Sequence, residues 1–200
     1  MKHIKKLILT FIISLLATNM SLIASEFNTT DSTQIDNVVN EFFSWYLTAI
    51  RQSEYLEFKP QFIENGNGMT TLDCTRYLTN LRKYHFSDSL IELEKQSYQV
   101  CISHLEKVKY ADFKSTFTDL DDFEETNCDF GNYYRWTGGQ ELIDGIRIRK
   151  MQLIKNITVL VSLEYYEYDS STNKYYYWGH NKLTLSYNSG KWKITNINWK

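Results

Sequence analysis

The chain has 200 residues with 22 basic and 24 acidic side chains, which gives a net charge of −2 at pH 7. Lysine and arginine do not cluster after the first six residues, so a nucleic acid, whose phosphates attract clustered positive charge, is not an expected partner. Aromatic residues make up 16% of the chain against a single proline, which excludes a disordered protein and favours a folded domain rich in β-sheet.

The first 25 residues have the parts of a secretory signal peptide. A basic start with three lysines precedes an apolar run over residues 7–17, and Ala24 and Ser25 offer a cleavage point. The apolar run is shorter than the about 20 residues of a membrane span, although an uncleaved anchor is the alternative. We therefore expect export to the periplasm or the extracellular space, without stable membrane insertion after cleavage. Removal of residues 1–25 would take away three lysines and no acidic residue, so the remaining chain would carry a net charge of −5.

Residues 26–33 are polar and predict a flexible N-terminus, and residues 34–200 have the length of one domain. Apolar side chains then recur every three or four residues. This pattern predicts a first helix with Asp31 as its N-cap that ends near Ser53. Its buried face is expected to contain Val38, Val39, Phe42, Phe43, Tyr46 and Ile50.

Two more helices are expected after a loop marked by Pro60 and the glycines and asparagines of residues 64–68. The second helix is predicted over about residues 70–86 and the third over 87–108, and their short connection predicts antiparallel packing. Residues 109–142 predict irregular structure with one short helix. The expected apolar stripes are Leu72, Tyr77, Leu78, Leu81 and Tyr84 on the second helix, and Leu90, Leu93, Tyr98, Cys101 and Leu105 on the third.

From Ile143 onward apolar and polar residues alternate, which predicts β-strands. Hairpin connections throughout predict a four-stranded antiparallel sheet. A bulge is expected at Gly179 and His180, and a register break is expected before Ile197. With one face of the sheet covered by the three helices, the fold class is α+β. The strands are expected around residues 146–148, 157–165, 174–187 and 192–199.

Three cysteines, Cys74, Cys101 and Cys128, allow three different single bridges in an oxidising compartment. With a helical rise of about 1.5 Å per residue, Cys74 and Cys101 would stand at similar heights on the predicted antiparallel helices. A Cys74–Cys101 disulfide is therefore the preferred prediction. A Cys101–Cys128 disulfide and three free thiols are the alternatives.

Three segments carry a resemblance to a known superfamily. The stretch FFSWYL at residues 42–47 and the ending GKWKITNI at residues 190–197 resemble the first helix and closing strand of nuclear transport factor 2-like domains, which have the cystatin-like fold. Residues 128–130 are similar to part of a bacterial secreted family of unknown function within that superfamily. The resemblance implies a cone-like packing of N-terminal helices on a curved antiparallel four-stranded sheet. It implies no particular activity, because members range from isomerases to binding modules and scaffolds.

Aromatic side chains in the second half of the chain are the candidates for a ligand-binding surface. Tyrosine and tryptophan combine apolar area with a polar tip, which binding surfaces favour, although ordinary core packing is the alternative. His180 lies beside the expected bulge in an aromatic strand that could line the mouth of the cone. The candidates are Tyr134, Trp136, Tyr165, Tyr177, Trp178 and His180.

A catalytic site is the rival interpretation. Isomerase-type members of the superfamily place an acid near a tyrosine deep in the cone, where burial raises the pKa of the carboxyl group. The acidic run at residues 119–125 lacks the glycine and ligand spacing of a calcium loop, and the histidines lack metal-site spacing. No metal and no cofactor is expected. The candidate bases are Asp122, Asp129 and Glu164, and the candidate donors are Tyr134, Tyr165 and Tyr177.

These observations predict an exported, non-enzymatic domain, monomeric or homodimeric, that binds a small molecule or a protein partner. One version is an immunity-type protein that neutralises a toxin by covering it. The alternative is an isomerase- or dehydratase-type enzyme with a buried carboxylate. A closed pocket with a buried acid beside a tyrosine would favour the enzyme, and exposed aromatic residues over a filled cone would favour the binding domain.

Overall fold

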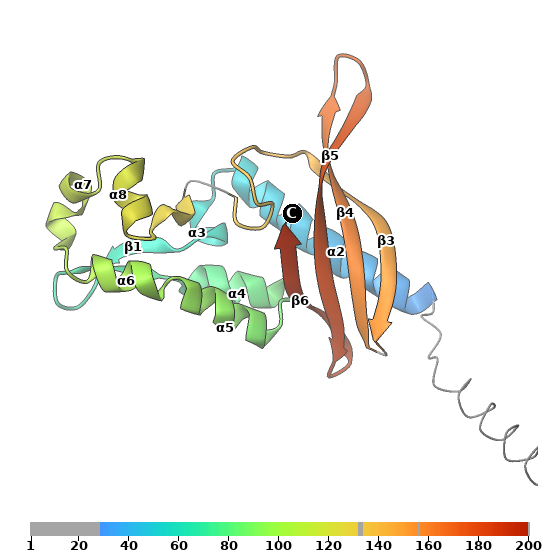
Figure 1. Ribbon diagram of the computed structural model, residues 1–200, viewed down its shortest axis with the longest axis horizontal. Coiled ribbons are helices and arrows are strands. Elements are labelled where there is room, and N and C mark those ends of the chain that lie inside the picture. Colours follow the sequence, from blue (N-terminus) through green and yellow to red (C-terminus); the bar gives the residue numbers. More distant parts are fainter. Residues whose placement is uncertain (1–28, 132–133, 156, 200) are drawn as a thin grey trace, which may run out of the picture.

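The computed structural model describes residues 29–131, 134–155 and 157–199, so the predicted signal peptide lies outside the described residues. A group of helices precedes a four-stranded antiparallel sheet, which confirms the predicted α+β class (Figure 1). Among the helices described, none is long and apolar enough to cross a membrane.

Helix α2 (Thr29–Arg51) runs across one face of the sheet (Figure 1). All six residues of its predicted apolar face are buried. The helix begins at Thr29, so Asp31 lies in its first turn and is not the N-cap that the sequence predicted, and the segment predicted to be flexible over residues 26–33 overlaps the start of the helix. The carboxylate of Asp31 accepts the indole N–H of Trp192 at 3.4 Å, which ties the start of the helix to the last strand.

The prediction of one helix over residues 70–86 is wrong in its first part. After a short helix α3 (Tyr55–Phe58), strands β1 (Gln61–Glu64) and β2 (Thr70–Asp73) pair as a hairpin, and helix α4 (Thr75–Lys83) begins only after them. β-Branched threonines favour extended backbone. Moreover, both the N–H and the hydroxyl of Thr70 donate to the carbonyl of Val108, at 2.8 and 3.0 Å.

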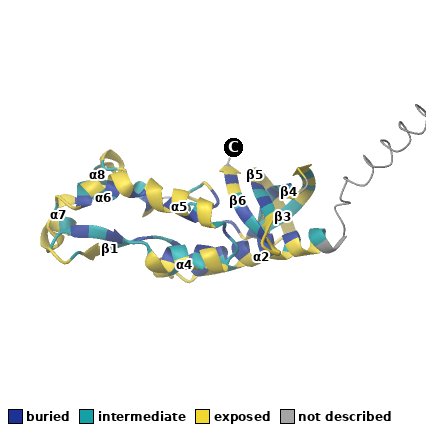
Figure 2. Ribbon diagram, turned by 90° about the horizontal axis from the view of Figure 1, so that it is seen from below, coloured by how far each residue is buried: buried dark blue, intermediate teal, exposed yellow. Residues whose placement is uncertain are grey.

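The predicted third helix is broken at Tyr98 into α5 (Asp88–Ser97) and α6 (Gln99–Leu105). At the break the Ser97 hydroxyl donates to the carbonyl of Glu94 at 2.7 Å, a local bond of the kind that bends helices. α4 and α5 lie antiparallel, as predicted (Figures 1 and 2). The buried face is rotated from the predicted one, because Leu93 is 62% exposed. It consists of Ile91, Glu94, Tyr98, Cys101 and Leu105.

Residues 109–142 are more regular than predicted. They contain two short helices, α7 (Phe113–Thr116) and α8 (Leu120–Glu125), and two 3-10 turns, η1 (Tyr110–Asp112) and η2 (Asp129–Gly131). Phenylalanine rings hold this part together with β1, with neighbouring centroids 4.8 to 6.4 Å apart. The rings belong to Phe62, Phe113, Phe117, Phe123 and Phe130.

The disulfide joins Cys101 of α6 to Cys128, with Cα atoms 5.0 Å apart, so the preferred Cys74–Cys101 prediction is wrong and its first alternative holds. Cys74 is not on a helix face opposite Cys101, because it is the residue that precedes α4. It is a free, partly buried cysteine, and burial raises the pKa of its thiol to about 11.

The four strands β3 (Gly145–Lys155), β4 (Thr158–Asp169), β5 (Lys174–Asn188) and β6 (Lys191–Trp199) pair in chain order, all antiparallel. The predicted bulge is confirmed, because Glu164 pairs with His180 and Tyr165 with Trp178, which leaves Gly179 unpaired at φ +61°. The predicted register break before Ile197 is also confirmed by a shift in the pairing of β5 with β6.

The core lies between the sheet and the helices. Buried residues follow α2 and the strands that it crosses (Figure 2). The α4–α5 connection is tied to the sheet, since the N–H of Ile194 donates to the carbonyl of His85 at 2.8 Å and the N–H of Ser87 to the carbonyl of Ile194 at 2.9 Å. At the other end of α2, Arg51 donates to the carbonyl of Ile143 at 3.0 Å, which fixes the entry into β3.

Candidate functional site

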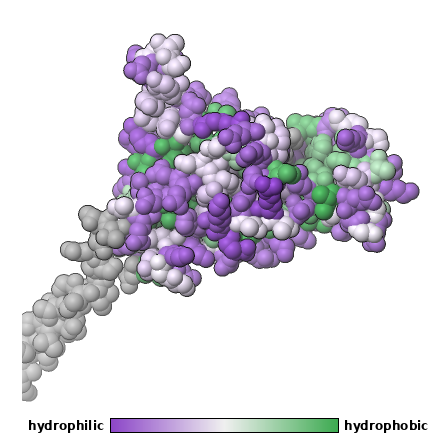
Figure 3. Space-filling model, turned by 180° about the vertical axis from the view of Figure 1, so that it is seen from behind, coloured by the Kyte–Doolittle hydropathy of each residue, from purple (hydrophilic) through white to green (hydrophobic). Residues whose placement is uncertain are grey.

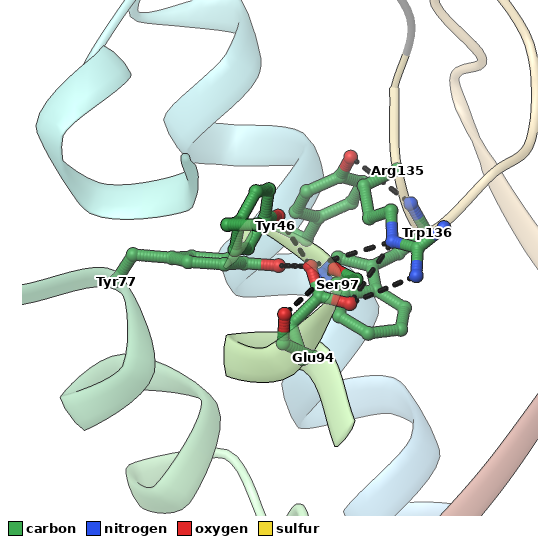
Figure 4. Close-up of polar contacts among 7 residues, drawn as sticks. Tyr46, Tyr77, Glu94, Ser97, Arg135 and Trp136 are labelled. Atoms are coloured by element: carbon green, nitrogen blue, oxygen red, sulfur yellow. Dashed lines mark hydrogen bonds and ion pairs between the residues drawn. The ribbon is translucent and has the colours of Figure 1, made fainter. Parts of the chain in front are cut away.

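Glu94 is the one charged side chain that is fully buried among the described residues, at 2% exposure. Its Oε1 accepts the hydroxyl of Tyr77 from α4 at 2.9 Å and the hydroxyl of Tyr98 at 2.5 Å (Figure 4). Burial of a carboxylate without such partners would destabilise the fold by several kcal/mol. These hydrogen bonds therefore allow Glu94 to be buried.

Arg135 completes this cluster from the other side. Its Nε and Nη2 donate to Oε2 of Glu94 at 3.0 and 2.9 Å. Burial lowers the pKa of Arg135, but the nearby carboxylate more than offsets this, so the pKa is raised overall. Burial, reinforced by the same carboxylate, raises the pKa of Tyr77 and of Tyr98. The four residues, which we call the Glu94 network, therefore combine a carboxylate, a guanidinium and two neutral phenols.

A cavity of about 270 Å³ lies beside the Glu94 network, and Tyr98 and Arg135 form part of its wall. We call it the Lys59 cavity. Its lining comes from α2, from α3 and the residue after it, from the junction of α5 and α6, and from η2 and the segment that follows η2. The lining residues are Tyr46, Tyr55, Phe58, Lys59, Tyr98, Phe130, Gly131, Tyr134, Arg135 and Gln140.

Lys59 is partly buried in this wall, and burial lowers the pKa of its ammonium group. Its Nζ lies 4.4 Å from the centroid of the Tyr55 ring, within cation–π distance. No carboxylate of the described chain forms an ion pair with it. The buried Tyr46 hydroxyl accepts the backbone N–H of Trp136 at 3.2 Å. Within the described residues, the cavity thus has aromatic walls, one cation without an ion pair, Lys59, and one paired cation, Arg135.

The predicted binding residues do not form a single site. Tyr134 lines the Lys59 cavity. Trp136 is buried and packs edge-on against Phe86, with centroids 4.8 Å apart, so it belongs to the core. Tyr165, Trp178 and His180 line a second cavity of about 140 Å³.

In the second cavity, Tyr165 is held in place by Asn181, whose side-chain amide donates to the tyrosine oxygen at 2.8 Å. Burial raises the pKa of Tyr165 to about 12, although the bond from Asn181 lowers it. The Gly138-Gly139 pair and Gly179 of the β-bulge line the same cavity. The bulge therefore brings three of the candidate residues together, but in a space of about 140 Å³, which holds only a few non-hydrogen atoms.

Tyr177, the remaining predicted residue, lies on the outer face of the sheet. Its ring stacks beneath the guanidinium of Arg147, at 3.5 Å from the centroid. The pairing of Tyr166 with Tyr177 and of Tyr168 with Tyr175 places four tyrosines on this face, near the end of the β4–β5 hairpin. Neighbouring centroids are 4.9 to 6.3 Å apart. We call these four residues the tyrosine face, and the hairpin that carries them projects from the body (Figures 1 and 3).

The three predicted bases have other roles or positions. Asp122 closes the capping box of α8 and accepts the N–H of Thr118 at 2.7 Å, a bond that lowers its pKa. Glu164 accepts Arg147 at 2.5 Å, which lowers the pKa of its carboxyl group, and it also pairs with Arg149. Asp129 begins η2. None of the three lines the cavities described above.

Glu94 and Lys59 were not predicted from the sequence. The sequence did contain an indication of Glu94. It is a charged residue in a stripe of buried residues, Ile91, Tyr98 and Cys101, that recur every three or four positions along the chain. A charge inside an apolar stripe indicates a buried partner of opposite sign. Lys59 had no comparable signal, since it precedes Pro60 in what the sequence shows only as a loop.

The part of the chain that the structure describes contains no group of three histidine, cysteine or acidic side chains arranged to hold a metal. Comparison of the chain with protein-family models, with curated proteins and with solved structures finds no match.

Proposed function

We propose that this protein is a non-enzymatic binding domain that holds a small molecule in the Lys59 cavity. The observation that carries the proposal is a concave aromatic wall with a few convergent polar groups, one of which, Arg135, is held in place by a buried acid. Ligand sites commonly combine these features. The volume of about 270 Å³ lies just below the roughly 300–1,000 Å³ of ordinary ligand sites, so the ligand is small.

The arrangement of Glu94 favours binding over an isomerase- or dehydratase-type reaction. A buried carboxylate beside tyrosines is present, but its oxygens already accept hydrogen bonds from Tyr77, Tyr98 and Arg135. A general base must reach a proton of the substrate, and Glu94 does not line the cavity.

The tyrosine face supports a protein partner as a second candidate function. Tyrosine and arginine are enriched where protein interfaces are tightest, and here four tyrosine rings lie beside Arg147 on a projecting hairpin. A toxin covered by an immunity-type protein is one version of such a partner. Joint substitution of Tyr175 and Tyr177 by serine would abolish this binding and leave the Lys59 cavity unchanged.

We also propose export with removal of residues 1–25, and membership of the nuclear transport factor 2-like class. The Cys101–Cys128 disulfide supports export, because disulfides persist in oxidising compartments. The long helix α2 across a four-stranded antiparallel sheet supports the class. N-terminal sequencing of the protein secreted by its own host tests the export proposal, with Glu26 or Ser25 expected as the first residue.

Native mass spectrometry of the protein purified from its host tests the cavity proposal. We expect a bound small molecule in the wild type and none in Gly131→Leu, whose side chain would occupy the cavity close to Lys59. Gly66→Leu is the matched control, because a side chain there meets open space. A bound mass that persists in Gly131→Leu would contradict the proposal.

A further inference from the structure

We infer that the ligand of the Lys59 cavity is a small organic monoanion, a carboxylate on a flat apolar body, bound through Lys59 and Arg135. The inference rests on the proposed function and specifies its ligand class. Four features of the cavity carry it: its charge, its free donors, its aromatic walls and its size.

The charge of the cavity favours one negative group. The positive charge of Arg135 is offset by Glu94, with which it forms a two-pronged ion pair at 2.9 to 3.0 Å. The ammonium of Lys59 has no such partner in the described chain, and it sits in a wall where burial penalises its charge. A ligand with a single negative charge would neutralise the cavity. A phosphate dianion would leave it with excess negative charge in a poorly solvated space.

Two further donors are available for a carboxylate. Arg135 uses Nε and Nη2 for Glu94, and its Nη1 makes no hydrogen bond within the described residues. Tyr46 accepts a hydrogen bond from the backbone of Trp136, which leaves its own proton for an acceptor in the cavity. Together with Lys59 these groups give the cavity three donors for a carboxylate, and hydrogen bonds between charged partners are the stronger kind.

Aromatic residues also line the cavity, close to Lys59, and indicate the body of the ligand. Tyr55, Phe58 and Phe130 line the cavity with their rings, and Phe130 is buried. At about 30 Å³ for each water-sized group, 270 Å³ holds roughly nine groups. This is the size of a benzene ring that carries one carboxylate, and flat rings favour stacked or edge-on contact with such walls.

The test uses benzoate and phenylacetate, their uncharged amides benzamide and phenylacetamide, and inorganic phosphate, titrated into the full-length secreted protein by isothermal calorimetry. We expect the acids to bind at least about tenfold more tightly than the matched amides, and phosphate to bind more weakly than the acids. Lys59→Met, which keeps the apolar stem, should lose this preference. Lys59→Arg should keep it, and Lys174→Met, at the exposed start of β5, should bind as the wild type does.

The outcomes separate this inference from the proposed function. If acids and amides bind equally well and Gly131→Leu abolishes both, the cavity binds small molecules but the monoanion inference is wrong. Phosphate that binds as tightly as the acids would also overturn it. If no acid and no amide binds, the monoanion inference fails, and the cavity proposal fails with it only if native mass spectrometry also finds no bound molecule in the wild type. Thermal unfolding of Lys59→Met beside that of Lys59→Arg shows whether a lost affinity reflects lost folding.

Discussion

Arg135 and Glu94 are 41 residues apart in the chain, yet two nitrogens of the guanidinium lie 3.0 and 2.9 Å from one carboxylate oxygen. The contact joins the segment after η2 to α5, and Tyr77 extends it to α4. Because Arg135 also lines the Lys59 cavity, the bond that holds three parts of the helical group together also determines one wall of the cavity.

Replacement of Glu94 by alanine should lower the free energy of unfolding by about 3 kcal/mol. The loss leaves two buried tyrosine hydroxyls without their acceptor and one arginine without its counterion. The value is at the lower end of the range for buried pairs, because the Arg135 side chain is 33% exposed and partly screened by water. Urea unfolding measures the change. Glu92→Ala, an exposed position on the same helix, is the control and should change stability by less than about 0.5 kcal/mol.

Stability should fall when the pH rises above about 10. The pKa values of Tyr77 and Tyr98 are raised in the folded protein above the value of about 10 in an unfolded chain. The unfolded chain therefore releases protons that the folded protein keeps, so this contribution is complete below pH 10 and is lost above it. Lys59, whose pKa is lowered, acts in the opposite direction but is a single group.

Urea unfolding across this pH range, together with tyrosinate absorbance, measures the effect. We expect the buried tyrosines to ionise only as the protein unfolds. The double substitution Tyr77→Phe and Tyr98→Phe should weaken the alkaline dependence without removing it, because the pKa values of Tyr46, Tyr165 and Cys74 are also raised by burial. An unfolding free energy that stays constant well above pH 10 would show that these hydroxyls ionise in the folded state.

Loss of the Cys101–Cys128 disulfide should cost about 3–4 kcal/mol. The bond closes a loop with a sequence separation of 27, and chain entropy sets this magnitude. The double substitution to serine, compared with Cys74→Ser, isolates the effect. Peptide mapping of the unreduced protein should recover Cys101 and Cys128 in one linked pair and Cys74 as a thiol. A linked peptide that contains Cys74 would be incompatible with this pairing.

Gly145→Ala should destabilise the protein by about 1–3 kcal/mol. A methyl group at this position would collide with the ring and hydroxyl of Tyr166, which lies across Gly145 from the neighbouring strand. Thermal unfolding measures the cost, and Gly66→Ala, which meets nothing within 4 Å, is the control. Equal stability of the two variants would mean that Tyr166 moves aside freely.

Short-range patterns were enough to predict the elements of the sheet and the first helix. The buried face of α2 and the alternation of Val159, Val161 and Leu163 follow from the helical and strand periods, which each residue shares with near neighbours. Gly179 marked its bulge because glycine takes a positive φ without strain. The periodicity did not predict β2. The threonines and leucine at residues 70–72 form too short a run to distinguish the strand period of two residues from the helical period of 3.6 residues.

The partners of Glu94, Cys101 and Lys59 could not be obtained in this way. Glu94 contacts Arg135 because α5 ends at Ser97, just before Tyr98, and because the segment after η2 folds back over α5. Cys101 had two candidate partners from the sequence, and the helix geometry that favoured Cys74 does not hold because α4 begins only after Cys74. Periodicity records which side of an element is apolar, whereas contacts between distant segments depend on how whole elements pack, and no local pattern encodes that packing.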